Sequence, residues 1–221
     1  MATIAPAPAS APNEQRFRLS GITWEQYEGL LHSLEGRHLR ITYDRGELEF
    51  MTVSPEHERA KKILARMLEA LTEELDVPIL GLGNTTYRRE DLERGVEPDE
   101  CWYIAHEEAM RNCTRIDLTT DPPPDLVIEI EVTRSLLNRI SIYESLGTPE
   151  IWRYDGKTLR ILLLGDERTY VEAAESATFP GLKASDLARF VAERETMDET
   201  RLVKRFRAWV REYLLNREGT R

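Results

Sequence analysis

Acidic residues of this chain occur inside two short apolar segments, where a solvated loop would not place them. The segment PDECWYI carries Asp99, and the segment PDLVIEIEVTRS carries Asp125, Glu129 and Glu131. Charged side chains are rarely buried unless they are paired or bind a metal ion. Because side chains alternate along a strand, the three acids of the second segment would share one face of a sheet.

Converging carboxylates repel one another unless a cation or a proton lies between them. A hard divalent cation such as Mg²⁺ prefers carboxylate oxygens, and such an ion among several acids indicates metal-dependent hydrolysis of phosphodiester bonds. The alternative is that the acids are turn residues at the ends of strands, since Asp99 and Asp125 both follow a proline. The spacing alone leaves both interpretations open.

The first half of the chain contains the strongest signals for the elements that would position these acids. A helix is predicted in SGITWEQYEGLLHSL, with Ser20 or Thr23 as its N-cap. A hairpin with a Gly-bearing turn follows in HLRITYDRGELEFMTVS. The segment SPEHERAKKILARMLEALTEEL is the clearest helix, with Ser54 as its N-cap and Pro55 at the first helical position.

Short strands and further helices are predicted after that helix. The strands are PILGLG, which is apolar enough to be central, then TTYRRE, EPDECWYI, PDLVIEIEV, PEIWRYD, TLRILLLG and RTYVEAAES. The helices are RSLLNRISIYESLG, ended by Gly147, then ASDLARFVAE and ETRLVKRFRAWVREYLL. We therefore expect a disordered Ala/Pro-rich tail over 1–16, one mixed α/β domain over 17–195, and a basic amphipathic helix over 196–221.

The composition is that of a soluble globular protein. Of the 221 residues, 32% are charged and 41% are hydrophobic. No apolar run is long enough to span a bilayer, and the N-terminal segment has no signal-peptide pattern. Cys101 and Cys113 do not form a disulfide framework, and Cys101 is expected in the core. We expect a cytoplasmic protein that does not associate with membranes.

In this order, the segments resemble the PD-(D/E)XK nuclease superfamily. Within it they resemble the bacterial Uma-two family of restriction-endonuclease-like proteins, which is widespread in cyanobacteria. The resemblance rests on SPEHERA, YRREDLERGVEPDECWYI, PDLVIEIEVTRSLLNRISIYESLGTPEIWRYDG and FPGL. It implies an α/β (α+β) restriction-endonuclease-like fold: a mixed β-sheet core flanked by helices, with an N-terminal helix and β-hairpin and C-terminal helices.

The same resemblance implies a site and an activity. In the PD-(D/E)XK pattern an Asp ends one strand and an acid-x-Lys triplet lies on its neighbour. This pattern assigns Asp99 and Glu129 as ligands of Mg²⁺ or Mn²⁺, with the backbone carbonyl of Ile130 as a third ligand. Glu58 matches a helix acid that many members add to the metal shell, or it complements the helix dipole. The adjacent His57 would orient a water or phosphate, or be an exposed residue at the helix start. The implied activity is that of an endonuclease acting on nucleic acid, DNA in the first place.

The triplet departs from the pattern because Glu131 occupies the Lys position. A carboxylate cannot stabilise developing negative charge as an ammonium group would. In one explanation Glu131 joins the metal shell, and Arg139 from the following helix supplies the cation, with Tyr143 one turn later. In the other, the site has decayed, and the protein is a nucleic-acid-binding or regulatory module. A different class of enzyme has no supporting motif.

Charge is unevenly distributed along the chain. The formal net charge of −10 argues against a surface that is basic throughout. Residues 201–221 carry seven basic against two acidic residues, which would contact phosphates or form a solvated helix face. Arg88 and Arg89, before Asp99, would contact a phosphate backbone or belong to a solvated loop.

An apolar stripe marks the C-terminal helix, formed by Leu202, Phe206, Trp209 and Tyr213. A stripe of this size must be covered, either by its own domain or by a second copy across a two-fold axis. The second alternative predicts a homodimer. A dimer would place two active sites side by side, as cleavage of both strands of a duplex requires.

Overall fold

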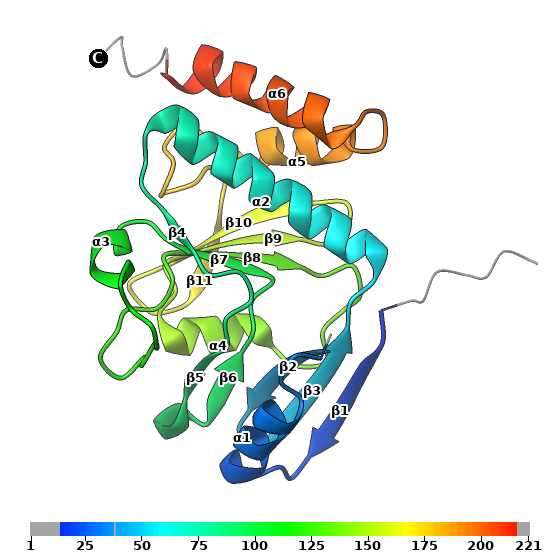
Figure 1. Ribbon diagram of the computed structural model, residues 1–221, viewed down its shortest axis with the longest axis vertical. Coiled ribbons are helices and arrows are strands. Elements are labelled where there is room, and N and C mark those ends of the chain that lie inside the picture. Colours follow the sequence, from blue (N-terminus) through cyan, green and yellow to red (C-terminus); the bar gives the residue numbers. More distant parts are fainter. Residues whose placement is uncertain (1–13, 38, 216–221) are drawn as a thin grey trace, which may run out of the picture.

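Two β-sheets lie one after the other in the computed structural model, which describes residues 14–37 and 39–215 (Figure 1). The five-stranded sheet has the order β1 (Arg16–Ser20), β3 (Glu47–Thr52), β2 (Leu39–Asp44), β6 (Arg94–Val96) and β5 (Tyr87–Arg89). The six-stranded sheet has the order β11 (Tyr170–Ala173), β10 (Leu159–Leu164), β9 (Glu150–Tyr154), β8 (Leu126–Ile130), β7 (Glu100–Tyr103) and β4 (Leu80–Gly81).

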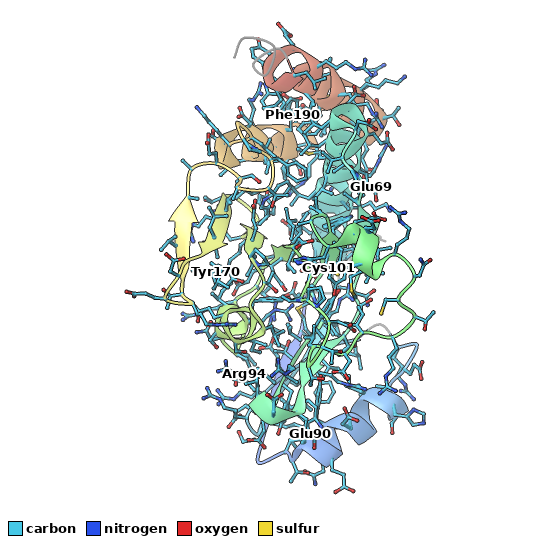
Figure 2. All side chains as sticks on the ribbon, turned by 90° about the vertical axis from the view of Figure 1, so that its left-hand side faces the viewer. Glu69, Glu90, Arg94, Cys101, Tyr170 and Phe190 are labelled. Carbon is cyan, nitrogen blue, oxygen red and sulfur yellow. The ribbon has the colours of Figure 1, made fainter. Side chains whose placement is uncertain are left out.

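Helices cover both faces of the six-stranded sheet (Figure 1). The α-helices of the described residues are α1 (Trp24–Ser33), α2 (Pro55–Leu75), α3 (Glu107–Met110), α4 (Arg139–Leu146), α5 (Ala184–Glu193) and α6 (Glu199–Trp209), which continues as a π-helix over Val210–Leu215. A short 3₁₀ helix spans Glu90–Leu92. In the side view of Figure 2, Phe190 lies toward one end of the molecule and Glu90 toward the other. Helix α2 lies across one face of the sheet and α4 lies on the other.

The two sheets meet in the middle of the molecule. Only Glu97, Pro98 and Asp99 separate the end of β6 in one sheet from the start of β7 in the other. Strands β8 and β9 are parallel, and the remaining pairs of the described strands are antiparallel. A parallel pair requires a crossover connection, which here consists of a loop and α4. The crossover brings the start of α4 to the junction of the sheets.

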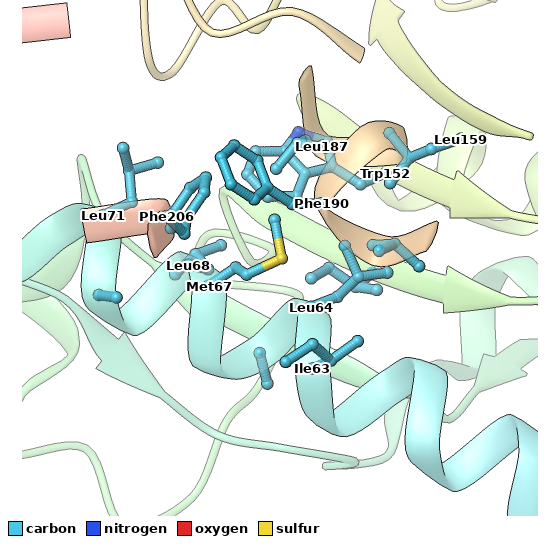
Figure 3. Close-up of a cluster of buried hydrophobic side chains, with 14 of the residues drawn as sticks. Ile63, Leu64, Met67, Leu68, Leu71, Trp152, Leu159, Leu187, Phe190 and Phe206 are labelled. Carbon is cyan, nitrogen blue, oxygen red and sulfur yellow. The ribbon is translucent and has the colours of Figure 1, made fainter. Parts of the chain in front are cut away.

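Helix α2 forms the centre of the main hydrophobic core. Its start follows the prediction, because the Ser54 hydroxyl accepts a hydrogen bond from the N–H of His57 and Pro55 is the first helical residue. The helix ends at Asp76, whose φ of 53° is left-handed. Figure 3 shows the α2 side chains gathered with residues of the sheet and of α5 and α6: Ile63, Leu64, Met67, Leu68, Leu71, Trp152, Leu159, Leu187, Phe190 and Phe206. Burying one such side chain contributes about 1.5–3 kcal/mol.

The apolar stripe of the C-terminal helix packs within the chain. Leu202 and Phe206 are buried against α2 and α5, whereas Tyr213 is 52% exposed. Arg207 and Arg211 form ion pairs with Glu74 of α2. The stripe therefore does not itself require a second copy, and these two basic side chains neutralise acids of α2. Arg217 and Arg221 lie outside the described residues.

The N-terminal helix and hairpin follow their local sequence signals. Thr23 and Gln26 form a capping box at the start of α1, as expected for Thr23. Strands β2 and β3 are joined through Arg45 and Gly46, both with positive φ (48° and 87°), a conformation suited to a two-residue hairpin turn. Helix α1 packs against this sheet through Tyr27, which stacks on Tyr43 with ring centroids 4.7 Å apart.

Some elements differ from the sequence-based expectation. The PILGLG segment forms only β4, a two-residue strand at the edge of its sheet, so its expected central position is wrong. Apolar content indicates burial but not the order of strands. Residues 1–13 of the expected tail lie outside the described residues, whereas Glu14 is buried and Arg16 begins β1. The short helix α3 was not predicted.

The two cysteines agree with the sequence analysis, whereas the helix predicted from Arg134 begins only at Arg139, where Asn138 caps it. Cys101 is buried and Cys113 is exposed, and both are free thiols. Trp102 and Trp152 lie in the core. No helix in the described part of the chain combines the length and apolar character that a membrane crossing requires.

Candidate active site

Asp99 lies at the junction of the two sheets, and its side chain is buried. Its Oδ2 accepts a hydrogen bond from the N–H of Ile130 at 2.8 Å and lies 3.1 Å from Nε2 of His57. Its Oδ1 has no hydrogen-bond partner among the described residues, and the nearest charged nitrogen is Nε of Arg40 at 3.8 Å. An unpaired oxygen of a buried carboxylate is unfavourable. This atom is therefore a site for a further donor or cation.

Glu129 on β8 completes a pair of buried carboxylates. Strands β7 and β8 are antiparallel, with Glu100 opposite Ile128. Continued by one residue, this register places Asp99 opposite Glu129, and directly opposite side chains share a face of the sheet. The structure thus brings together two of the acids that the sequence analysis selected.

Helix α4 supplies two side chains to Glu129. Nη2 of Arg139 donates to Oε1 of Glu129 at 2.6 Å, and the hydroxyl of Tyr143 donates to the same oxygen. Asn138 caps the helix by accepting a hydrogen bond from the N–H of Ser141, so Arg139 is the first helical residue. Arg139 and Tyr143 lie on one face because residues four apart are neighbours on a helix.

Arg139 also joins the two sheets. Its Nη1 donates to Oγ1 of Thr42 on β2, and its Nη2 donates to the backbone carbonyl of Glu97, both at 2.8 Å. Its side chain is 11% exposed and that of Glu129 is 8% exposed. A guanidinium held by three acceptors from different elements has little rotational freedom. The position of the positive charge is therefore set by the tertiary structure.

The two carboxylates have opposite pKa shifts. Burial raises the pKa of Glu129, an effect that Arg139 opposes and Asp99 strengthens. Burial would also raise the pKa of Asp99, but the hydrogen bond and charge of His57 outweigh it and hold this pKa below its ordinary value. Burial raises the pKa of Tyr143 well above its ordinary value, so its hydroxyl stays protonated and donates. A cation bound next to Asp99 and Glu129 would stabilise the charged form of both carboxylates.

A cavity of about 450 Å³ opens beside the carboxylate pair. Asp99 and Glu129 line it together with four arginines, which are Arg16, Arg134, Arg139 and Arg153. Acidic groups that can bind a metal ion, next to arginines that can bind phosphate oxygens, suit a phosphodiester substrate.

Glu131 and Glu58 both have partners other than the carboxylate pair. Glu131 follows the end of β8; its Oε2 accepts a hydrogen bond from Nε of Arg153 at 2.7 Å, and its Oε1 accepts one from the N–H of Ser135. Glu131 lines the cavity. Glu58 is 42% exposed, forms an ion pair with Lys61 at 2.7 Å and faces a different hollow of the surface. The structure does not bring Glu58 to the carboxylate pair.

Asp125 holds the backbone after β7 in place, in agreement with the turn interpretation. Its Oδ2 accepts hydrogen bonds from the N–H groups of Ile104 and His106, and its Oδ1 lies 2.6 Å from Nδ1 of His106. Arg88 pairs with Glu28, and Arg89 pairs with Asp91. None of these groups lines the cavity.

His57 is the side chain that the sequence analysis undervalued. It is buried rather than exposed at the helix start, and its hydrogen bond to Asp99 raises its pKa, although burial alone would lower it. Helical spacing was a usable signal, because His57 shares the stripe of Ala60 and Leu64 at i, i+3 and i+7. Arg153 had no comparable signal, since its contact with Glu131 depends on the pairing of β9 with β8.

The carboxylate pair fits a hard divalent cation. Mg²⁺ is usually bound by one or two carboxylates and several waters. Asp99 and Glu129 supply two such groups, one of them with an oxygen that lacks a partner. No group of three or more His, Cys, Asp and Glu side chains in residues 14–37 and 39–215 is arranged to hold a metal ion. The chain therefore offers two carboxylate ligands, and water or substrate oxygens would complete the shell.

Comparison with known proteins indicates the family of the chain. The model of the Uma2 family, described as "Putative restriction endonuclease", matches residues 24–192. Among solved structures, a "putative nuclease" from Anabaena variabilis is similar, with a TM-score of 0.49 and 14% identity over 68% of this chain and 90% of that chain. Comparison with curated proteins gives no match. The family match and the mixed sheet flanked by helices confirm the restriction-endonuclease-like fold expected from the sequence.

Proposed function

Since the chain belongs to the Uma2 family of restriction-endonuclease-like proteins, we propose that it is a metal-dependent nuclease that hydrolyses phosphodiester bonds of DNA. One observation carries the proposal: the buried carboxylates of Asp99 and Glu129 lie together at a cavity with arginines in its lining. The cofactor proposed is Mg²⁺ or Mn²⁺, because the ligands are carboxylate oxygens.

The residues around the pair have separate tasks in this mechanism. A divalent ion, when bound, would neutralise negative charge on the scissile phosphate and lower the pKa of a bound water. Asp99 and Glu129 bind the ion, while His57 and the N–H of Ile130 orient Asp99. Arg139 orients Glu129 and contributes a permanent positive charge close to the phosphate.

Arg139 differs from a lysine in one respect. A guanidinium remains charged at all ordinary pH values, so it stabilises negative charge but does not exchange protons. The proton of the attacking water therefore passes to another acceptor, such as solvent or a phosphate oxygen. The hydroxyl of Tyr143 on α4 donates a hydrogen bond to Glu129, and burial raises the pKa of Tyr143 so that the hydroxyl stays protonated.

Cleavage of plasmid DNA with Mg²⁺ or Mn²⁺ tests the proposal. The variants Asp99→Asn and Glu129→Gln keep the side-chain shape but weaken metal binding, and we expect both to lose at least about 100-fold in cleavage rate. Glu172→Gln is the matched control, because Glu172 is an exposed acid on β11, with 65% of its side chain accessible. A wild-type protein without activity under varied metal conditions would contradict the proposal, as would Asn and Gln variants that cleave normally.

A second candidate function is favoured by the ion pair between Arg139 and Glu129. The guanidinium already neutralises one of the two carboxylates, and an acid occupies the usual Lys position. A decayed enzyme with this site would bind nucleic acid or a regulatory partner without cleaving it. Calorimetric titration with Mn²⁺ separates the two candidates, because only the nuclease requires binding at micromolar to millimolar concentrations that is lost in Asp99→Asn.

Assembly and location are part of the proposal. A homodimer would place two sites on one duplex, although the stripe on α6 is covered within the chain. Light scattering at micromolar concentration tests it, and a mass near the 25.6 kDa of one chain would contradict it. A cytoplasmic location likewise stays a prediction, testable by fractionation of cells that express the protein.

A further inference from the structure

The loop over residues 131–138, between β8 and α4, alternates between outward and inward side chains. Arg134 and Leu136 are exposed, with Leu136 at 47%, whereas Ser135 and Leu137 are partly buried. All four residues line the cavity beside the carboxylate pair. The loop therefore presents one cation and one apolar side chain to the mouth of the proposed active site.

The backbone of this loop is held by two acidic side chains, Glu49 and Glu131, of which Glu49 is buried. Glu49 on β3 accepts hydrogen bonds from the N–H of Leu137 at 3.2 Å, from the N–H of Leu136 and from the hydroxyl of Ser135 at 3.1 Å. Glu131 accepts from the N–H of Ser135 at 3.0 Å. Side chains that project from an anchored backbone are pre-organised, so less ordering free energy is required when they contact a ligand.

Arg134 differs from the other arginines of the cavity. Arg16 pairs with Glu49, Arg139 with Glu129, and Arg153 with Glu131. Arg134 has no ion-pair or hydrogen-bond partner for its side chain within the described ranges. Its positive charge is therefore available for a ligand, in a chain whose formal net charge is −10.

We infer that the 131–138 loop is a contact site for the nucleic-acid backbone, an inference that rests on the proposed nuclease function. Arg134 binds a phosphate next to the one that is cleaved, and Leu136 packs against the adjoining sugar or base. A phosphate is the expected partner because a guanidinium binds it through two parallel hydrogen bonds. A local cation at the cavity mouth also offsets the repulsion between an acidic protein and a polyanion.

Salt dependence of binding tests this inference without cleavage. Fluorescence anisotropy would follow a short labelled DNA duplex in EDTA between about 50 and 200 mM salt. Each phosphate contact contributes about 0.9 to the slope of log K against log salt. Arg134→Ala should bind more weakly with a slope smaller by about that amount, and Arg134→Lys should retain the wild-type slope because it keeps the charge. Leu136→Ala should weaken binding at an unchanged slope.

Arg201→Ala is the matched control, because Arg201 is an exposed arginine on α6, and α6 lies on the far side of α2 from α4 (Figure 1). It should bind as the wild type does. If Arg134→Ala keeps the wild-type slope while the wild type binds DNA and cleaves it with metal, this inference is wrong and the nuclease proposal stands. A wild type that binds no duplex and cleaves none would overturn both.

Discussion

Arg139 and Glu129 form a buried ion pair across the crossover of the six-stranded sheet, with Nη2 lying 2.6 Å from Oε1. The arginine is the first residue of α4, and the glutamate lies on the strand before that helix. The same guanidinium donates to Thr42 and to the carbonyl of Glu97 in the other part of the structure. One side chain thus contributes to the charge of the site and to the attachment of the two sheets.

Removal of this cation should destabilise the protein strongly. In Arg139→Met the charge of Glu129 is buried without compensation, and such changes typically reduce the free energy of unfolding by about 3–5 kcal/mol. Urea denaturation measures the loss. The double variant Arg139→Met/Glu129→Gln should recover a large part of it, because the uncompensated charge is gone. Equal stability of the single variant and the wild type would show that the pair is not buried in solution.

Glu49 should determine the rigidity of the 131–138 loop. Hydrogen bonds to a charged acceptor contribute about 1.5–3 kcal/mol each, so Glu49→Gln should open the loop more often. Amide exchange at Leu136 and Leu137 should become about 10-fold faster or more, measured by hydrogen exchange. Glu47→Gln is the control on the same strand, since Glu47 contacts Arg18 and Ser20 instead. Unchanged protection in Glu49→Gln would disprove the anchoring role.

Docking of α6 on α2 should weaken in acid. Hydrogen bonds from Arg211 and Arg207 hold the pKa of Glu74 below its ordinary value. A group with a lowered pKa contributes stability above the unfolded-state value of 4.5, and this stability is lost as pH falls through the folded-state pKa. Glu74→Gln should therefore lose less stability than the wild type between neutral pH and pH values below 4.5.

Urea denaturation over this pH range measures the difference. Glu69→Gln serves as the control, because Glu69 is an exposed acid on the same helix (Figure 2). If wild type and Glu74→Gln have parallel pH profiles, the ion pairs with α6 do not contribute.

Gly95 should tolerate no side chain. A Cβ at this position would lie 2.0 Å from the hydroxyl oxygen of Tyr27, which packs over β6. Overpacking of this kind costs about 1–3 kcal/mol, so Gly95→Ala should lower the melting temperature. Addition of Tyr27→Phe should relieve part of the loss, because it removes the clashing oxygen, which has no hydrogen-bond partner in the described structure.

Gly29 provides the comparison for this prediction. It lies in α1, and a Cβ there meets nothing within 4 Å. Gly29→Ala should raise stability by about 0.5–1 kcal/mol, since glycine is unfavourable inside a helix. If Gly95→Ala and Gly29→Ala shift the melting temperature in the same direction, the close packing of Tyr27 on β6 is not present.

Signals confined to a few neighbouring residues predicted most elements of this protein. Ser54 and Pro55 start α2, Arg45 and Gly46 turn the hairpin, and Gly147 ends α4 with a φ of 86°. These outcomes depend on caps, dihedral preferences and hydrophobic spacing, which act over one or two turns of chain. The sequence, through its family resemblance, also selected Asp99, Glu129 and Arg139, and the structure brings these three side chains together, whereas their roles stay predictions.

Contacts between distant segments were decided only by the tertiary structure. The register of β7 against β8 places Asp99 opposite Glu129. The pairing of β8 with β9 brings Glu131 and Arg153 together as an ion pair. The direction of α2 buries His57 beside Asp99. A carboxylate has the same local sequence signal whether its partner is a cation, a histidine or water. Its role depends on which charged groups the folded chain places within a few ångströms, because electrostatic interactions in a buried site fall with distance and not with separation in sequence.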